Sequence, residues 1–519
     1  MYPVSHILRR ACSLFPERIA VIDGEQRFTY RALADRVHRL AAALRARGLQ
    51  TGDRVAIVDW NSHRYLEAYY ACAHAGLALM PVNSRLSPRE LSGILKDADA
   101  RALMFSEPFR PLYEDIAASN AIETAIGLAL PDTPAHVLDY ETLIAAAEQM
   151  HEPQEAALDD ITLIYYTSGT TGEPKGVCLT HRNMYCGALD GILINAVTRY
   201  DSWLHSGPLF HLATSWAVYA MPLVGGRQLV VHFEPARVID LLARERVTMT
   251  AMPGAILGMV ADMLQAKAYD FSALRTIVYG GAPTPMGVLQ KAFNALPPAL
   301  THVYGITELA GYVTTLLPQD HVFDDSEKTL QRTASAGQAV PLVDVRVVGE
   351  EGRDVPAGQV GEIICSGPKV MAGYWRKPAQ TAAVLRDGWY HTGDMGVLDE
   401  ERFLTVVDRK KDMIISGGEN VYSVEVESVI SLHPGVAEVA VIGVPDERWG
   451  EAVKAIVVAR AGGAVSADDI IGFCRGKVAG YKIPKSVDFR GDPLPKTGPG
   501  KIAKRALREP YWQVVGRKI

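Results

Sequence analysis

The sequence predicts an α/β fold in which a large N-terminal domain precedes a small α+β domain. The chain has 519 residues, and because domains usually contain about 100–200 residues, several structural units are expected. Strand and helix patterns alternate up to about residue 300, which predicts two mainly parallel sheets with helices packed on them. From about residue 343 short strands are separated by turn signals, which predicts a small, mostly antiparallel β subdomain.

The first elements follow from hydrophobic spacing. Residues 30–47 place apolar side chains on one face of a helix, and Gly48 follows as its end signal. Residues 53–59 and 100–105 are apolar enough for buried strands. Residues 107–158 are rich in Ala, Pro and acidic residues and show little periodicity, so we expect them to be peripheral.

A dense charge run at residues 408–412 follows the antiparallel strands. We place a domain boundary inside this run, so that residues 1–410 form the N-terminal domain and residues 411–519 the C-terminal domain. The pattern after the boundary is a compact mixture of helices and strands. The predicted elements are a helix at 424–431, strands at 436–444 and 452–459, a helix at 467–478 and a short strand near Val487.

Composition and charge exclude several classes of protein. Hydrophobic residues make up 48% and charged residues 22% of the chain, which is ordinary for a globular protein. The formal net charge of −6 provides no basic field for a nucleic acid. The six cysteines are scattered without a Cys-x-x-Cys pair, which indicates reduced thiols in a cytoplasmic protein and no zinc site. No signal peptide and no transmembrane segment are recognisable.

A loop rich in glycine and hydroxyl groups is the most informative stretch. An apolar run at residues 161–166, which predicts a buried strand, leads into residues 166–176, which hold three glycines, several Ser and Thr residues and Lys175. Free backbone amides, hydroxyls and one ammonium group suit a polyphosphate. Lys175 is followed by Gly176, whereas the common P-loop requires Ser or Thr there. The loop alone leaves an ordinary surface turn open; a helix is expected after it, from about His181.

Further short motifs follow in a definite order, and each alone has an ordinary explanation, such as a strand-end turn, a helix N-cap or a solvated charged loop. Together they resemble the adenylate-forming superfamily of acyl-CoA synthetases, nonribosomal adenylation domains and luciferases. Within it, the chain resembles the fatty-acid or aryl-acid CoA ligases, and the match covers nearly the whole sequence. The motifs are residues 208–211, 279–283, 304–308, 389–394, 408–412, 416–420 and 494–501.

The resemblance implies that the chain binds ATP and Mg²⁺. It assigns the phosphates to the loop and to Thr307, the adenine to the stretch after residue 280 and to Tyr304, and the ribose to an Asp–Arg pair. Glu308 would offer Mg²⁺ a hard oxygen ligand. The nucleotide-binding residues would be Thr167, Ser168, Gly169, Thr170, Thr171, Gly172, Lys175, Gly281, Ala282, Pro283, Tyr304, Gly305, Thr307, Asp394 and Arg409, with Glu308 as the metal ligand.

The resemblance also implies a mobile C-terminal domain that turns about a hinge at Lys411 between two half-reactions. Lys501 would be the main catalytic residue, assisted by His211 and Glu308. Pro499 departs from the usual lead-in to this lysine and should stiffen its loop. Coenzyme A would pass a segment containing Gly417, Gly418 and Glu419.

The acyl pocket implied by the resemblance is apolar, aromatic or lined by small residues. The stretches around it contain no basic residue that would pair with a second carboxylate. We therefore expect a hydrophobic monocarboxylic acid, and the choice between a fatty and an aryl acid stays open. The pocket residues would be His211, Trp216, Tyr279, Gly280 and Gly311.

The predicted reaction is acid + ATP + CoA → acyl-CoA + AMP + pyrophosphate through an acyl-adenylate. One alternative is an adenylating enzyme that loads the thiol of a carrier protein, and another is a luciferase-like oxygenase. From a different class, the chain would be an inactive nucleotide-binding sensor or scaffold. The presence together of Lys501, Glu308, Asp394 and Arg409 argues against that last alternative. The expected partner is a small carboxylic acid, and a homodimer stays open.

Overall fold

The protein is described here from a computed structural model. It describes residues 1–117, 122–168, 174–266, 269–281, 284, 286–296, 300–324, 326–410, 412–417, 419–446, 448–460, 465–496 and 502–513. The chain divides into a larger unit, residues 1–345 with 365–390, and a smaller unit, residues 346–364 with 391–519. The boundary expected between residues 410 and 411 stays a prediction.

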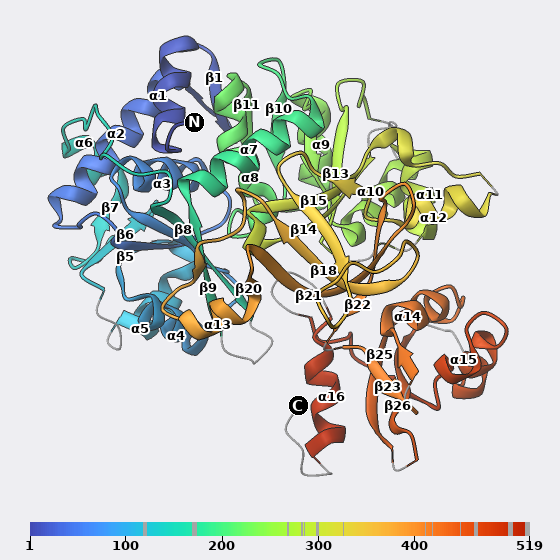
Figure 1. Cartoon of the computed structure of the whole chain (residues 1–519). Coiled ribbons are helices and arrows are strands. Elements are labelled where there is room, and N and C mark those ends of the chain that lie inside the picture. The colour runs from blue at the N-terminus through green and yellow to red at the C-terminus, as the bar shows by residue number, and fades with distance from the viewer. Residues whose placement is uncertain are drawn as a thin grey trace. The chain divides into compact units, whose positions relative to one another are not determined.

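The larger unit contains a mainly parallel sheet that, in the described residues, has nine strands in the order β16-β15-β14-β13-β12-β10-β11-β1-β2. Figure 1 labels β1, β10, β11, β13, β14 and β15 of this sheet. All pairs from β14 to β1 are parallel, and the pairs at both ends are antiparallel. The strands are β1 (Ile19–Asp23), β2 (Gln26–Thr29), β10 (Ser202–His205), β11 (Arg227–Val230), β12 (Met249–Ala251), β13 (Thr276–Gly280), β14 (Leu300–Ile306), β15 (Gly311–Leu316) and β16 (Gln338–Ala339).

A second sheet of the larger unit has, in the described part of the chain, eight strands in the order β19-β9-β8-β4-β3-β5-β6-β7. It is parallel from β8 to β7 and antiparallel at β9 and β19. Strand β6 is fully buried, so the expectation that residues 107–158 are peripheral is wrong. The strands are β3 (Arg54–Val58), β4 (Ala78–Pro81), β5 (Ala100–Ser106), β6 (Thr124–Leu128), β7 (Leu138–Asp139), β8 (Ile161–Ser168), β9 (Pro174–Thr180) and β19 (Gly373–Tyr374).

Helices connect the parallel strands, as hydrophobic spacing predicted. The Thr29 side chain caps the first long helix and Gly48, with φ +87°, follows its end. The helix expected from His181 begins there behind a capping box and continues to Asn195. The helices are α1 (Ser5–Leu14), α2 (Tyr30–Ala46), α3 (His63–His74), α4 (Pro88–Ala98), α5 (Arg110–Ala117), α6 (Tyr140–Ala146), α7 (His181–Asn195), α8 (Leu212–Val224), α9 (Pro235–Arg244), α10 (Gly254–Ala266), α11 (Met286–Ala295), α12 (Glu327–Ala334) and α13 (Pro378–Val384).

A fully buried ion pair fixes the segment that leads to β19. Lys369 Nζ lies 2.6 Å from Asp190 Oδ2 on α7 and donates to the Tyr312 carbonyl at 2.5 Å. The Asn183 amide, also on α7, donates to the carbonyls of Pro368 and Val370. A buried charge pair of this kind is costly unless further hydrogen bonds compensate its burial. The Tyr312 carbonyl provides one for Lys369, and the Leu342 amide provides one for Asp190 at 3.1 Å.

The two remaining sheets form the predicted β subdomain and α+β domain. In the described residues the first has the order β17-β18-β21-β20 with β22 on β21, and the second β24-β23-β26-β25 with β27 on β26. All the C-terminal elements expected after residue 424 are present. The elements are β17 (Asp344–Val348), β18 (Val360–Ser366), β20 (Leu385–Arg386), β21 (Trp389–Leu398), β22 (Leu404–Arg409), β23 (Ile414–Ser416), β24 (Glu419–Val421), β25 (Val436–Asp446), β26 (Gly450–Ala459), β27 (Ser486–Arg490), α14 (Ser423–Ser431), α15 (Ala467–Cys474) and α16 (Lys504–Gln513).

Two absences concern only the ranges given above. No helix in them is long and apolar enough to cross a membrane. No group of three or more His, Cys, Asp or Glu side chains in them is arranged to hold a metal ion. The six cysteines all lie within these ranges and are free thiols.

Candidate active site

The predicted phosphate loop joins two antiparallel strands. Strand β8 leads into it as expected, and β9 leaves it, with Thr167 opposite Lys175 and Ser168 opposite Pro174. The loop therefore connects β8 and β9, the paired strands of a β-hairpin that extends the parallel sheet. The predicted phosphate-binding residues Gly169, Thr170, Thr171 and Gly172 lie outside the described residues.

Lys175 and Glu308, the predicted phosphate and metal residues, meet at one aromatic side chain. The Lys175 ammonium lies 4.9 Å from the ring centroid of Tyr374, and the Tyr374 hydroxyl donates to Glu308 Oε1 at 2.9 Å. Tyr374 is only 8% exposed. Burial raises the pKa of Tyr374, and the nearby Glu308 carboxylate raises it further. The phenol therefore stays a proton donor to Glu308 at neutral pH.

Strand β14 and the turn after it contain the predicted site residues Tyr304, Gly305, Thr307 and Glu308. Tyr304 and Gly305 lie near the end of β14, and a single 3₁₀ turn from Thr307 to Leu309 follows. Burial raises the pKa of Tyr390, with Glu308, Tyr374 and Tyr304 as further causes, so these four groups are electrostatic neighbours. Gly305 is required sterically, because a Cβ there would lie 2.5 Å from the Gly311 carbonyl oxygen.

Gly280, predicted for the acyl pocket, and Gly281, the first residue of the predicted adenine stretch, are adjacent at the end of β13 but differ in their surroundings. At Gly280 a Cβ would lie 2.1 Å from the Val303 carbonyl oxygen, so the strand pair β13–β14 excludes a side chain. Gly281 has φ +79° with nothing within 4 Å of a Cβ, which leaves space beside the backbone. Ala282 and Pro283 lie outside the described residues.

The predicted acyl-pocket residues are only partly brought together. His211 is the N-cap residue of α8. Trp216, on α8, packs in the core, and its ring centroid lies 4.8 Å from that of Trp203 and 5.7 Å from that of Tyr312. Gly311, with φ +116°, has nothing within 4 Å of a Cβ. That these residues line a pocket stays a prediction.

Tyr279, also predicted for the pocket, is held inside the larger unit. Its ring stacks on the His302 ring with 4.7 Å between the ring centroids, and its hydroxyl oxygen lies 2.8 Å from His321 Nε2. The side chain is almost completely buried. In the structure Tyr279, a residue of β13, makes the contacts of a core residue.

In the smaller unit the two predicted ribose residues are neighbours. Asp394 on β21 lies opposite Arg409 on β22, and Arg409 Nε lies 3.5 Å from Asp394 Oδ1. The Asp394 amide donates to Thr392 Oγ1 at 3.0 Å. Asp394 is 8% exposed, so its carboxylate is held in place while the Arg409 side chain is half exposed.

The predicted coenzyme A segment connects the paired strands β23 and β24 in the smaller unit. Ser416 on β23 lies opposite Glu419 on β24, and Gly417 between them has φ +63°. The Gly417 amide donates to the Trp449 carbonyl at 2.8 Å. The predicted Gly418 lies outside the described residues, as do the hinge residue Lys411 and the catalytic residue Lys501.

The charge run contains a residue that sequence analysis did not single out. Asp408 is buried, and its Oδ2 accepts from the amide and the hydroxyl of Ser423 at 2.5 and 2.6 Å. Asp408 thus fixes the start of α14 to β22. Tyr374 was also missed; the one signal for it is the aromatic pair after Gly373.

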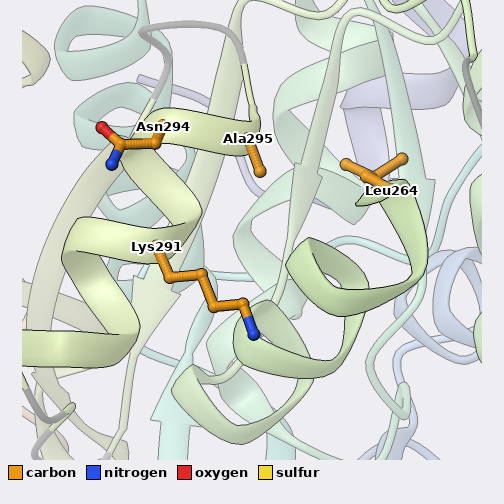
Figure 2. A pocket seen from close by; sticks show the side chains of 4 residues that line it. All are labelled: Leu264, Lys291, Asn294 and Ala295. Atoms are coloured by element: carbon orange, nitrogen blue, oxygen red, sulfur yellow. The ribbon is translucent and has the colours of Figure 1, made fainter. Parts of the chain in front are cut away.

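A cavity of about 270 Å³ has none of the predicted site residues in its lining. It is lined by Leu264 on α10 and by Lys291, Asn294 and Ala295 on α11. Figure 2 shows the Lys291 side chain extending from α11 towards the neighbouring helix, where its ammonium pairs with Asp262. The lining therefore supplies no residue to which the predicted chemistry assigns a role.

Comparison with known families decides the class. A family model described as AMP-binding enzyme matches residues 8–375. A second, described as AMP-binding enzyme C-terminal domain, matches residues 425–501. The chain belongs to the AMP-binding enzyme family. This confirms the predicted adenylate-forming superfamily and its acyl-CoA synthetase branch.

Relatives of this AMP-binding enzyme are acid–thiol ligases. Feruloyl-CoA synthase of Amycolatopsis sp is 39% identical over 504 residues, covering 97% of this chain and 98% of that protein. A fatty acid–acyl-carrier-protein ligase of Streptomyces coeruleorubidus is 36% identical, with 97% and 95% coverage. The solved o-succinylbenzoate CoA synthetase of Bacillus subtilis, in complex with an acyl-adenylate, is 31% identical with a TM-score of 0.85 and 97% coverage of both chains. The predicted fold class and the AMP-forming acid–thiol ligase class are confirmed.

Proposed function

We propose that this AMP-binding enzyme converts a hydrophobic fatty or aryl monocarboxylic acid, ATP and coenzyme A into acyl-CoA, AMP and pyrophosphate. The observation that carries the proposal is the meeting of Lys175 and Glu308 at Tyr374, next to the hairpin turn. An ammonium group and a carboxylate held together in this way suit a magnesium–polyphosphate. Lys501, in the C-terminal motif, completes the set.

The chemistry requires a better leaving group than the oxide of a carboxylate. In the first step the acid attacks the α-phosphorus of ATP, and negative charge develops on the phosphoryl oxygens and the departing pyrophosphate. Lys175 stabilises that charge, Lys501 bridges the carboxylate and the α-phosphate, and Asp394 accepts hydrogen bonds from the ribose hydroxyls. In the second step the thiol of coenzyme A attacks the acyl carbonyl and AMP leaves.

Mg²⁺ fits the residues that are present. This ion is usually bound through one or two carboxylates together with phosphates and water, and not by a cage of protein ligands. Glu308 supplies one oriented carboxylate, and the described ranges contain no group of three or more acidic, His or Cys ligands. When bound, the ion would neutralise charge on the β- and γ-phosphates.

The proposed acid is hydrophobic. Helix α8, which follows His211, contains no charged residue, so a second carboxylate would have no cation beside it there. Feruloyl-CoA synthase, the 39% identical relative, supports an aryl acid. The carrier-protein ligase, at 36% identity, supports a fatty acid and keeps a carrier-protein thiol as the second candidate acceptor.

The test is a pyrophosphate-release screen over ferulic, cinnamic, indoleacetic, medium-chain and long-chain fatty acids, and dicarboxylic controls. We expect release with hydrophobic monocarboxylic acids, absence of release with the dicarboxylic acids, and a thioester only when coenzyme A is supplied. Substituting a phosphopantetheinyl carrier protein for coenzyme A decides the acceptor. Nucleotide binding without pyrophosphate release for any acid would support the inactive sensor and contradict the proposal.

We propose a cytoplasmic location because the six cysteines are free thiols, which persist in reducing compartments. Fractionation of the source cells tests this. Light scattering of the purified chain decides between a monomer and a homodimer. Neither result affects the proposed reaction.

A further inference from the structure

The backbone of Tyr374 is fixed beside the phosphate hairpin. Strand β19 adds to β9 in antiparallel pairing, with Tyr374 opposite Val177. The flanking amides of Ala372 and Trp375 donate to the carbonyls of Cys178 and Gly176 at 3.0 and 2.7 Å. These bonds on both sides of residue 374 hold the Tyr374 backbone against β9.

The same short segment also holds Glu308 at two points. The Met371 amide donates to the Glu308 carbonyl at 2.8 Å, and the Tyr374 hydroxyl donates to Glu308 Oε1 at 2.9 Å. The main chain and the carboxylate of Glu308 are thus both oriented from residues 371–374. The buried pair of Lys369 and Asp190 anchors this segment to α7.

The face of the Tyr374 ring makes a third contact. Lys175 Nζ lies 4.9 Å from the ring centroid, within the range in which an ammonium group is attracted to an aromatic face. Lys175 and Tyr374 lie on neighbouring strands. One side chain thus contacts a cation through its ring and an anion through its hydroxyl.

We propose that Tyr374 is a positioning residue that fixes the Glu308 carboxylate and the Lys175 ammonium relative to each other for magnesium–ATP. The inference rests on the proposed function for the roles of Glu308 and Lys175, and adds a residue to which neither the family resemblance nor the relatives assign a role. Because Tyr374 acts through two different groups, its two effects are separable. The hydroxyl orients the Glu308 carboxylate and so affects the affinity for Mg²⁺. The ring holds the Lys175 ammonium and so affects the affinity for the phosphates of ATP.

The first variant is Tyr374→Phe, which keeps the ring and removes only the hydroxyl. We expect the concentration of free Mg²⁺ needed for half-maximal ATP binding, measured by calorimetry without acid or coenzyme A, to rise about 10-fold, because a hydrogen bond to a charged group is lost. In a Glu308→Gln background the same substitution should have little further effect, since the two act on one ligand. Equal effects in both backgrounds would overturn the inference.

The second variant is Tyr374→Leu, which also removes the ring. We expect a further loss of ATP affinity at saturating Mg²⁺ that disappears in a Lys175→Met background. If the leucine variant does not fold, comparing Lys175→Met with Lys175→Arg tests the ring contact from the other side, because Arg also binds aromatic faces. Retention of wild-type ATP affinity by Lys175→Met would overturn this half of the inference.

Tyr140→Phe is the matched control. The Tyr140 hydroxyl also donates to a glutamate, Glu67, and both side chains are buried, but none of the predicted site residues takes part in this contact. This variant should lose stability and keep the wild-type Mg²⁺ requirement; a matching Mg²⁺ shift would show that Tyr374 has only a structural role. If wild-type protein binds magnesium–ATP and releases pyrophosphate while Tyr374→Phe is unchanged, the inference fails and the proposed function stands.

Discussion

Arg409 lies directly opposite Asp394 on the paired strands β22 and β21, with 3.5 Å between Arg409 Nε and Asp394 Oδ1. The two residues come from separate sequence motifs. The antiparallel register of β21 and β22 brings the two side chains together, so neither motif alone would predict their contact. The half-exposed Arg409 guanidinium lies beside the nearly buried Asp394 carboxylate, and the predicted further partner of this carboxylate is the ribose of ATP.

Asp394→Asn tests whether that partner is a ribose. The carboxylate accepts from two hydroxyls, whereas the amide offers one oxygen, so we expect the KM for ATP to rise roughly 10- to 100-fold with a smaller change in kcat. The preference for ATP over 2′-deoxy-ATP should shrink in the variant. Asp399→Asn, in the same hairpin, where the carboxylate accepts from the Phe403 amide, should keep that preference. An unchanged ratio in Asp394→Asn would exclude ribose binding.

Lys501→Ala separates the two half-reactions. Lys501 lies outside the described residues, and its role is predicted from its motif. If it bridges the carboxylate and the α-phosphate, the variant should lose adenylate formation and still form the thioester from supplied acyl-AMP. Single-turnover rates of each step are the measurement. Lys496→Ala, in the same loop but paired with Glu438 at 2.5 Å, should retain both steps, and equal loss of both steps in Lys501→Ala would contradict the assignment.

Lys411→Pro tests the predicted hinge. Proline fixes φ and restricts the preceding residue, so a rotation about this position should become harder. We expect thioester formation to slow more than adenylation. Lys411→Ala removes the same charge and keeps the backbone free, so it should retain both rates; similar losses in the two variants would point to the ammonium group and not to a hinge.

Features that depend on residues close together in the sequence were predicted, whereas contacts between residues far apart in the sequence were not. The helix at residues 30–47 and the strands at residues 436–444 and 452–459 are local patterns, and they were predicted within a few residues of their observed ends. Strand β6 was missed although residues 125–130 are apolar, because this short run lies in a stretch that is otherwise rich in Ala, Pro and acidic residues. Tyr374 was missed because its hydroxyl partner, Glu308, is 66 positions away. The partners Lys369 and Asp190 are 179 positions apart.

Lys369→Met should strongly destabilise the larger unit. The substitution leaves the Asp190 carboxylate buried without its cation, which costs about 3–5 kcal/mol. Chemical unfolding followed by tryptophan fluorescence measures the loss. The double variant Lys369→Met/Asp190→Leu removes the unpaired charge and should recover part of the stability. A double variant that is less stable than Lys369→Met would show that the Asp190 bond to the Leu342 amide matters more than the charge.

Three buried hydroxyl groups, those of Tyr69, Tyr165 and Ser215, connect β8 to α8 and to the 208–211 motif that precedes α8. Tyr165 OH, on β8, lies 2.6 Å from Tyr69 OH and 2.5 Å from Ser215 Oγ on α8. Tyr69 donates to the Leu209 carbonyl at 2.7 Å, and Ser215 donates to the His211 carbonyl at 3.3 Å. The 208–211 motif is therefore held by hydroxyls that lie outside that motif.

Tyr69→Phe should both destabilise the fold and loosen this motif. It leaves the Leu209 carbonyl without its donor, which costs about 1–3 kcal/mol, and we expect the KM for the acid to rise severalfold while the KM for ATP stays near its wild-type value. Tyr70→Phe is the matched control, because Tyr70 is the next residue on α3 and its hydroxyl also donates to a buried carbonyl, that of Val218. It should lose similar stability and keep the acid KM. If both variants raise the acid KM equally, the effect is general loosening of α8 and His211 is not positioned by this network.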